Sequence, residues 1–221
     1  MDAARAALWK LIEECRGLDF LLLTKRPKNA RRMVPASWAK EWPDHVWAGT
    51  TAENQKRARE RLPELLQIPA RIRFVSHEPA LEEVDFRPWM GDKVLCLTCG
   101  HRVFAAVVTC QRCGDTRFHS GPGVQWIITG GESGDQARHY DLATPRRILR
   151  DGAAGGVPIF VKQLGSYPVS GEVADGIARD KLPVYYEKDG SGRWEVHLKD
   201  SHGGDMEEWP ADLQGEQHFP V

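Results

Sequence analysis

Five short apolar runs alternate with amphipathic segments along the chain, and each run ends in polar residues. The runs occupy residues 18–27, 45–55, 71–81, 124–134 and 157–165. Short, fully apolar runs are typical of strands that are buried on both faces of a parallel sheet. Helical patterns follow the first, second and fourth runs, at residues 29–42, 54–67 and 141–156. This alternation predicts β/α units around a parallel sheet.

The two ends of the chain depart from this rhythm. A helical segment precedes Leu18, and residues 182–199 have the pattern of a β-hairpin. The polar tail at residues 201–221 is expected to fold back onto the domain. Its apolar anchors would be Trp209, Leu213 and Phe219.

The polar residues at the ends of the runs are candidates for a binding site. In a parallel sheet the carboxyl ends of the strands share one rim, and ligands bind there. A polar ending on a single run is also typical of an ordinary strand exit, so the prediction depends on all five runs together. The candidate substrate- or cofactor-binding residues are Thr24, Lys25, Arg26, Thr50, Thr51, Glu53, Asn54, Ser76, Glu78, Gly130, Gly131, Glu132, Ser133, Lys162 and Gln163. No catalytic residue can be assigned among them.

Two of these endings suggest specific chemistry. Gly130 and Gly131 would expose backbone amides beside the Glu132 carboxylate, a combination that suits a ribose, an ammonium group or another polar ligand. The same carboxylate could instead cap the next segment, and the residues alone leave both readings open. Lys25 and Arg26 suit an anion such as a phosphate or a carboxylate.

Four of the five cysteines form two Cys-x-x-Cys pairs, and each pair is followed by glycine. This spacing suits tetrahedral zinc, because each tight turn presents two thiolates. Four thiolates make a closed site, so the zinc would be structural. The apolar stretch 101–109 between the pairs predicts a two-stranded ribbon. The predicted metal ligands are Cys96, Cys99, Cys110 and Cys113.

Bulk properties narrow the class of protein. The formal net charge is −1, so no overall basic field points to nucleic acid, although local clusters could still bind it. No apolar run approaches the roughly 20 residues of a membrane helix, and the first residues lack the features of a secretory signal. We therefore expect a cytoplasmic protein.

Six sequence blocks carry a resemblance to a known family. They read LLLTKRPKN, VWAGTTAENQ, IPARIRFVSHEPAL, WIITGGESG, FVKQLG and GGDMEEWPADL. From about residue 18 to the end, the chain resembles a phage- and prophage-encoded family that looks like a radical-SAM-type (β/α) barrel of poorly defined activity. The resemblance implies an iron–sulfur cluster, S-adenosylmethionine and reductive radical chemistry, with a nucleic acid or nucleotide as one candidate substrate. A phage-encoded protein would act in the host cytoplasm.

The sequence departs from the family pattern at its start. Members begin with three clustered cysteines that hold the cluster, whereas the residues before Leu18 contain only Cys15. The chain thus resembles the carboxyl-terminal half of such a barrel, a parallel half TIM-type barrel. Residues 1–91 and 122–221 would form this partial barrel with its C-terminal extension, and residues 92–121 the inserted zinc ribbon. Leu164 also stands where an aromatic residue is usual.

A half barrel would leave one strand edge unpaired. We expect a second protein chain that completes the barrel, self-association, or closure by the N-terminal helix and the C-terminal tail. The first hypothesis is therefore the substrate- and cofactor-binding half of a split radical-SAM-like enzyme, whose partner chain carries the cluster. A stand-alone enzyme of another class, using Glu78, Glu132 and Lys162, is also open. The other alternative is a non-catalytic zinc-ribbon protein that binds a host protein or nucleic acid through Arg102, Phe104, Arg112, Arg117 and Phe118.

Overall fold

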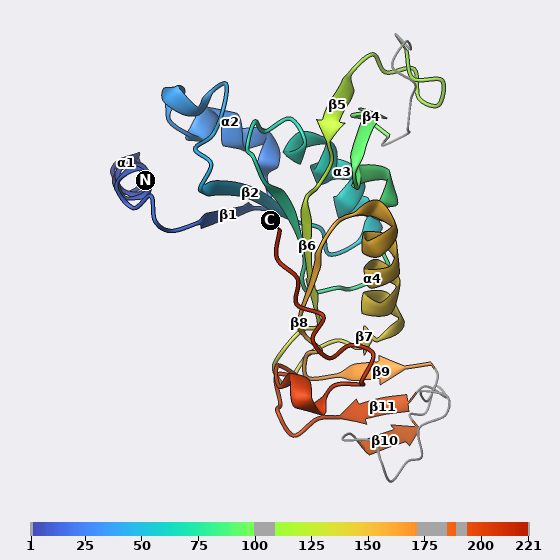
Figure 1. Ribbon diagram of the computed structural model, residues 1–221. Coiled ribbons are helices and arrows are strands. Elements are labelled where there is room, and N and C mark those ends of the chain that lie inside the picture. The colour runs from blue at the N-terminus through green and yellow to red at the C-terminus, as the bar shows by residue number, and fades with distance from the viewer. Residues whose placement is uncertain (1, 100–108, 172–184, 189–193, 221) are drawn as a thin grey trace.

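The main sheet of the computed structural model has five parallel strands, one for each apolar run of the sequence (Figure 1). The structure describes residues 2–99, 109–171, 185–188 and 194–220. The strands are β1 (Phe20–Thr24), β2 (Val46–Thr51), β3 (Arg73–His77), β6 (Trp126–Gly130) and β8 (Ile159–Gln163). Their order in the sheet, β1-β2-β3-β6-β8, is also their order along the chain. The predicted α/β class with a five-stranded parallel sheet is confirmed.

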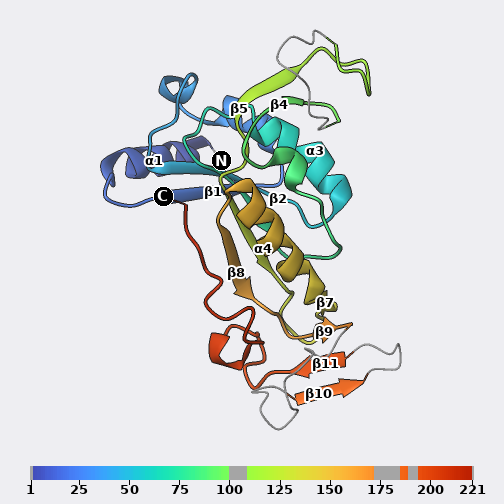
Figure 2. The same cartoon turned by 45° about the vertical axis from the view of Figure 1, so that its right-hand side comes forward.

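Helices cover one face of this sheet, as right-handed crossovers between successive neighbouring strands require. The principal helices of this layer are α3 (Gln55–Leu65) and α4 (Ala143–Gly155), which lie side by side on the sheet in Figures 1 and 2. Leu62 of α3 and Ile148 of α4 enter the same buried cluster as Val75 and Ile127 of the sheet. We call the other side of the sheet the helix-free face.

Local sequence explains where these two helices begin and end. The side chain of Asn54 accepts a hydrogen bond from the backbone N–H of Arg57 at 2.9 Å and so caps the first turn of α3. Ala58, Leu62 and Leu65 of α3 are buried at helical spacing. Helix α4 ends at Gly156, which adopts the left-handed conformation with φ of 65°.

The helix predicted over residues 29–42 is wrong in its extent. The segment contains the 3-10 turn η1 (Pro27–Asn29), the short helix α2 (Ala30–Met33) and the 3-10 turn η2 (Ala36–Trp38). Pro35 explains the break, because a residue that precedes proline is driven toward extended backbone. Val34 is extended, with φ of −87° and ψ of 162°, and the helix ends there.

Two smaller sheets complete the described chain. The strands β4 (Asp92–Cys96) and β5 (Phe118–Pro122) form an antiparallel pair that leads into the four-cysteine segment. The predicted C-terminal hairpin is present as β10 (Tyr185–Lys188) and β11 (Trp194–His197). This hairpin continues onto β9 (Pro168–Ser170) and β7 (Tyr140–Asp141), which the sequence did not predict. The 3-10 turns η3 (Arg87–Trp89) and η5 (Met206–Glu208) are also present.

The C-terminal tail closes the β8 edge of the main sheet. The N–H of Val161 donates to the oxygen of Glu216 at 2.8 Å, and the N–H of His218 donates to the oxygen of Ile159 at 2.9 Å. Trp209 is fully buried, as is Leu213, which confirms two of the predicted anchors. The third, Phe219, is 62% exposed, although its ring lies against Trp126 and Phe160 on the helix-free face.

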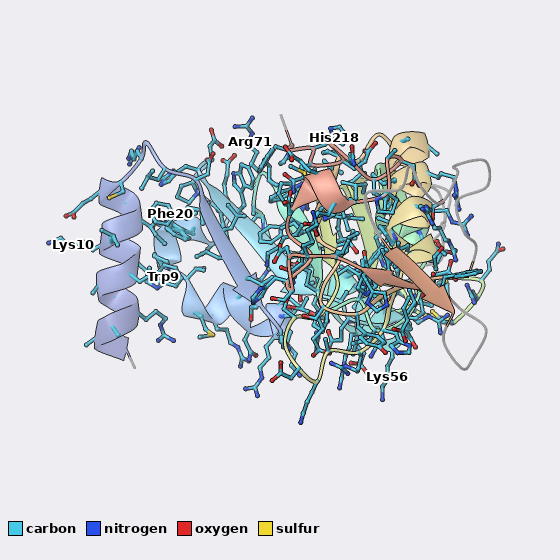
Figure 3. All side chains as sticks on the ribbon, turned by 90° about the horizontal axis from the view of Figure 1, so that it is seen from below. Trp9, Lys10, Phe20, Lys56, Arg71 and His218 are labelled. Carbon is cyan, nitrogen blue, oxygen red and sulfur yellow. The ribbon has the colours of Figure 1, made fainter. Side chains whose placement is uncertain are left out.

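The opposite edge, at β1, has no such cover in the described part of the chain. Phe20 donates its N–H to His45 beside β2, so the alternating parallel pattern turns the peptide groups of Leu21 and Leu23 outward. Helix α1 (Asp2–Glu14) stands beyond this edge, with Trp9 directed toward the sheet and Lys10 away from it (Figure 3). Six large apolar side chains around the edge are each at least 40% exposed: Leu8, Leu11, Leu18, Leu21, Leu23 and Met33.

Helix α1 is held by a few specific contacts. The indole N–H of Trp9 donates to the oxygen of Met33 at 3.1 Å, and Ile12 is fully buried. The His45 ring donates through Nε2 to the oxygen of Ile12 at 3.0 Å. Among the described residues, no helix is long and apolar enough to cross a membrane.

Candidate functional site

The registers of the main sheet bring the ends of its strands to one rim. Ser76 on β3 lies opposite Thr51 on β2, and Gln163 on β8 lies opposite Gly130 on β6. The last residues of β1 and β2 are likewise in register. The candidate residues predicted from the five strand ends therefore gather along one edge of the sheet rather than on separate sides of the molecule.

A carboxylate and an ammonium group meet on the β8 half of this rim. Oε1 of Glu78 lies 3.5 Å from Nζ of Lys162, and the Glu78 side chain is only 19% exposed. Burial raises the pKa of Glu78, against the opposing effects of Lys162 and of a hydrogen bond from Ser76. Glu78 directly follows β3 and Lys162 lies on β8, with β6 between them, so a ligand at the pair would lie over the β8 half of the rim.

Gly130 and Gly131 have distinct steric roles. A Cβ on Gly130 would lie 2.8 Å from Oε1 of Glu78, so the first glycine leaves room for that carboxylate. A Cβ on Gly131 would lie 2.3 Å from the backbone oxygen of Leu164, so the second glycine lets two loops touch backbone to backbone. The N–H of Gly131 donates to the oxygen of Gln163 at 3.1 Å. These glycines were predicted to expose backbone amides to a ligand, whereas in the structure they provide space for Glu78 and Leu164.

Glu132 and Ser133 lie on the loop that leaves β6. Arg138 donates to Glu132 through Nε at 2.8 Å and through its second guanidinium nitrogen at 2.9 Å. This hydrogen bonding lowers the pKa of Glu132 to about 2. The amide nitrogen of Gln163 donates to Ser133 Oγ at 2.7 Å and to the oxygen of Gly131 at 3.0 Å. Glu132 thus closes its own loop through Arg138, in agreement with the capping alternative.

Three candidates at the end of β2 hold the backbone together. The Thr50 hydroxyl donates to the oxygen of Thr24 at 2.7 Å and lies on the helix-covered face. Asn54 is the cap of α3. Glu53 forms an ion pair with Arg61 at 2.8 Å, and both side chains are largely buried. Burial alone would raise the pKa of Glu53, but its hydrogen bonds and the Arg61 guanidinium lower it overall.

The remaining two candidates at the end of β1 are freely accessible. Lys25 and Arg26 are exposed, and the N–H of Arg26 donates to the Thr24 hydroxyl at 3.0 Å. Lys25 is close enough to Glu53 to act on its ionisation. Lys25 therefore lies near the ion pair at the end of β2, and both cations face solvent.

His77 is not among the candidate residues predicted from the sequence, and it is fully buried below the rim. Its Nδ1 donates to the oxygen of Ala52 at 2.7 Å, and its Nε2 has no hydrogen-bond partner among the described residues. Burial lowers the pKa of His77 to about 4, so the ring is neutral. A histidine inside an apolar run is typical of a core position, and only the register places this one on the helix-covered face.

The four predicted metal ligands lie together. The sulfur atoms of Cys96, Cys99, Cys110 and Cys113 all lie within 4.8 Å of one another. The distance is 3.5 Å between Cys96 and Cys113, and 3.6 Å between Cys99 and Cys110. A regular tetrahedron with zinc–sulfur bonds of about 2.3 Å has edges of about 3.8 Å, so this group could hold a metal ion such as zinc. None of the five cysteines forms a disulfide.

The second cysteine pair is shaped to present thiolates. Burial alone would raise the pKa of Cys110, but the N–H groups of Arg112 and Cys113, with the sulfurs of Cys99 and Cys96, lower it to about 7. The N–H of Gly114 donates to the oxygen of Cys110 at 2.8 Å and closes the turn.

The two knuckles are also joined around the sulfur cluster. Arg117 pairs with Asp115 at 3.0 Å and donates to the Thr98 hydroxyl at 2.9 Å. The ribbon strands predicted between the two cysteine pairs lie largely outside the described residues, as do Arg102 and Phe104.

Comparisons with known proteins place the chain in a family without assigning an activity. No curated protein matches the chain, and no solved structure matches it. A family model does match, over residues 1–207. The chain belongs to the protein family DUF5131, a family of unknown function.

Proposed function

We propose that this chain is the ligand-binding half of an open (β/α)-barrel enzyme of the radical-SAM type. The C-terminal tail covers the β8 edge, and a second polypeptide that carries the iron–sulfur cluster completes the barrel along β1. The observation that carries the proposal is the sequential order of the five parallel strands, with one edge covered and the other exposing leucines. Sequential order is the arrangement of a singly wound barrel, whereas doubly wound sheets reverse direction. The phage origin and the cytoplasmic location remain predictions from the sequence.

The β1 edge supports completion by further β/α units. Leu21 and Leu23 offer unpaired peptide groups on the edge and apolar side chains on the helix-free face. A groove of about 680 Å³ runs between α1 and β1, and its lining includes Leu8, Trp9 and Met33. Exposed parallel edges with apolar faces are strongly unfavourable in isolation, so another strand is the natural cover.

The rim supports a ligand-binding role. Glu78 combines partial burial with a raised pKa, a pairing that is common for groups that exchange protons with a ligand. The side chain of Lys162 is 54% exposed, so its ammonium group can bind a negatively charged group of a ligand next to Glu78. Ser76 and Gln163 supply hydrogen-bonding groups on either side. A polar ligand with both an acidic and a basic group would fit this set.

The cysteines of this chain do not fit an iron–sulfur cluster with an open iron. The four clustered sulfurs form a closed set that suits zinc, and Cys15 lies at the end of α1 by itself. Under the proposal the partner therefore supplies the cluster ligands, and S-adenosylmethionine would bind only to the assembled pair. The zinc ribbon has a structural role.

Co-expression with an adjacently encoded polypeptide that carries three clustered cysteines tests the proposal. We expect a one-to-one complex that contains iron and cleaves S-adenosylmethionine. The double variant Leu21→Asp/Leu23→Asp should lose the complex, because two carboxylates would be buried at the new strand pair. The matched control is Ala153→Asp/Ala211→Asp, which adds the same charge at exposed positions away from β1 and from the cysteines and should leave the complex intact.

The co-expression experiment tests the β1 interface, the radical-SAM assignment and the need for a partner separately. A complex that survives both leucine substitutions would place the interface elsewhere than the β1 edge. A complex without iron or without S-adenosylmethionine cleavage would remove the radical-SAM assignment while keeping the barrel completion. A monomeric chain that turns over a substrate without iron would favour a stand-alone enzyme.

One observation favours the zinc-ribbon alternative, in which this segment binds a host protein or nucleic acid. Arg112 lies between the two cysteines of the second knuckle and is exposed. An Arg112→Glu variant should then lose capture of that partner while it retains its zinc. Unchanged capture by the variant would leave the ribbon with its structural role alone.

A further inference from the structure

A strongly basic segment follows the carboxyl end of β1. Residues 20–40 contain six lysines and arginines and no acidic residue, although the whole chain has a formal net charge of −1. The rest of the chain is therefore acidic, and positive charge is concentrated here. We call the following five exposed residues the β1 basic segment: Lys25, Arg26, Lys28, Arg31 and Arg32.

No carboxylate neutralises this segment within the described residues. Arg31 donates to the backbone oxygen of Gln67, and Arg32 donates to the side-chain oxygen of Asn29 at 2.9 Å. Both partners are neutral, so neither contact removes charge. Lys25 helps to lower the pKa of Glu53, but that carboxylate is already paired with Arg61 at 2.8 Å.

Helix α3 extends the positive surface. It packs against η1, which carries Lys28, and its own Lys56 and Arg59 are exposed. Arg57 is already matched by Glu60 at 2.7 Å, so it adds little net charge. The basic surface thus begins at the rim of the main sheet and continues over the β1–α2 and β2–α3 connections.

The shape of this surface favours a polymer over a single small anion. The cations are distributed along a turn and a short helix instead of converging on one point, and the side chains of Lys25, Arg26 and Lys28 contact no carboxylate in the described chain. A row of separate charges suits a row of phosphates.

We propose that the β1 basic segment binds the phosphate backbone of a single-stranded nucleic acid and delivers one of its nucleotides to the rim. This inference rests on the proposed ligand-binding role of the rim and names its substrate class. Glu78 and Gln163 are hydrogen-bonding groups that suit the edge of a base, and the exposed His139–Tyr167 pair, stacked at 4.5 Å, shows that the carboxyl side also carries flat rings.

Binding of a fluorescent 20-nucleotide single strand, followed by anisotropy over a range of salt concentrations, tests the inference. The logarithm of the binding constant should fall with the logarithm of salt by about 0.7 for each phosphate contacted. The triple variant Lys25→Gln/Arg26→Gln/Lys28→Gln should weaken binding at least tenfold and reduce that slope by about 2. The charge-matched control Arg71→Gln/Arg150→Gln/Lys199→Gln, at exposed positions elsewhere, should bind like the wild type.

Two further probes distinguish other polyanions. Polyglutamate of equal charge should bind more weakly than the oligonucleotide, and vesicles with anionic lipid should not bind through the same residues. The inference would be overturned if the chain bound polyglutamate as tightly as the oligonucleotide. It would also be overturned if the triple variant lost only vesicle binding, or if the triple variant and its control lost the same amount of oligonucleotide binding. The binding measurement uses this chain alone, so its result can be interpreted even if no partner chain completes the barrel. If the chain does not bind the oligonucleotide, the proposal that a partner completes the barrel is unaffected.

Discussion

The two glycines that end β6 should respond differently to the same added methyl group. In the Gly131→Ala variant the new Cβ would lie 2.3 Å from the backbone oxygen of Leu164 and 2.8 Å from its carbonyl carbon. Because backbone at the end of a buried strand yields poorly, we expect an overpacking cost of about 1–3 kcal/mol. In the Gly130→Ala variant the closest atom is Oε1 of Glu78 at 2.8 Å, the end of a side chain that can turn away.

The net cost at Gly130 should therefore be small. The backbone oxygen of Gln163, at 3.1 Å, must move only slightly. Loss of unfolded-chain entropy returns about 0.4–1 kcal/mol when glycine becomes alanine at a compatible position. Displacement of Glu78 would instead change the rim, by separating its carboxylate from Lys162, which now lies 3.5 Å away.

Thermal unfolding in zinc-containing buffer, followed by circular dichroism, separates the two variants. For a chain of this length each kcal/mol lowers the melting temperature by roughly 2–4 °C, so a cost of about 1–3 kcal/mol should make Gly131→Ala melt about 2–12 °C below the wild type. Gly130→Ala should melt within about 2 °C of it. The control Gly17→Ala has open space around its new methyl group and should be neutral. Equal melting of the Gly130 and Gly131 variants would refute this steric account of the strand end.

Three further predictions concern the buried histidine, the tail and the metal site. Burial lowers the pKa of His77 from 6.5 to about 4, so the unfolded chain takes up a proton first as the pH falls. In urea denaturation, the free energy of unfolding of the wild type should fall by up to about 3 kcal/mol more than that of His77→Asn between pH 6.5 and pH 4. If the unfolding free energies of the two proteins changed in parallel with pH, this expectation would be contradicted. Trp209→Ala, at a fully buried anchor, should cost about 3–5 kcal/mol, against less than about 1 kcal/mol for the exposed Phe219→Ala. Similar melting temperatures for these two tail variants would count against the anchoring role. Cys110→Ser should lose bound zinc on dialysis whereas Cys15→Ser keeps one ion per chain by elemental analysis, and equal zinc contents would exclude the four-thiolate site.

The strands of the main sheet could be predicted from the sequence because each is a short apolar run with a polar end. Their parallel pairing followed from the intervening helical patterns, and the shared rim followed from parallel pairing. The cysteine spacing likewise predicted the sulfur cluster, since the ligands lie close in sequence within each pair. These are features that depend on local order along the chain.

The features that the sequence missed depend on long-range or very short elements. Strands β7 and β9 have only 2 and 3 residues, too few for a periodic pattern. The pairing of the tail with β8 joins Glu216 to Val161 across the chain, and no local signal marks it. The rim residues also differ in role according to the face on which they lie. Successive side chains of a strand point to opposite faces, so Thr50 lies on the helix-covered face and Thr51 on the helix-free face.

Hydrogen exchange at the β1 edge tests the central claim most directly. Leu21 and Leu23 turn their peptide groups outward, so their amides should exchange rapidly in the isolated chain, while the amide of Phe20 is protected by its bond to His45. In the complex with the cluster-bearing polypeptide, both leucine amides should become strongly protected, as expected for a new strand pair. A complex that forms while these two amides continue to exchange as fast as before would contradict completion of the barrel along β1.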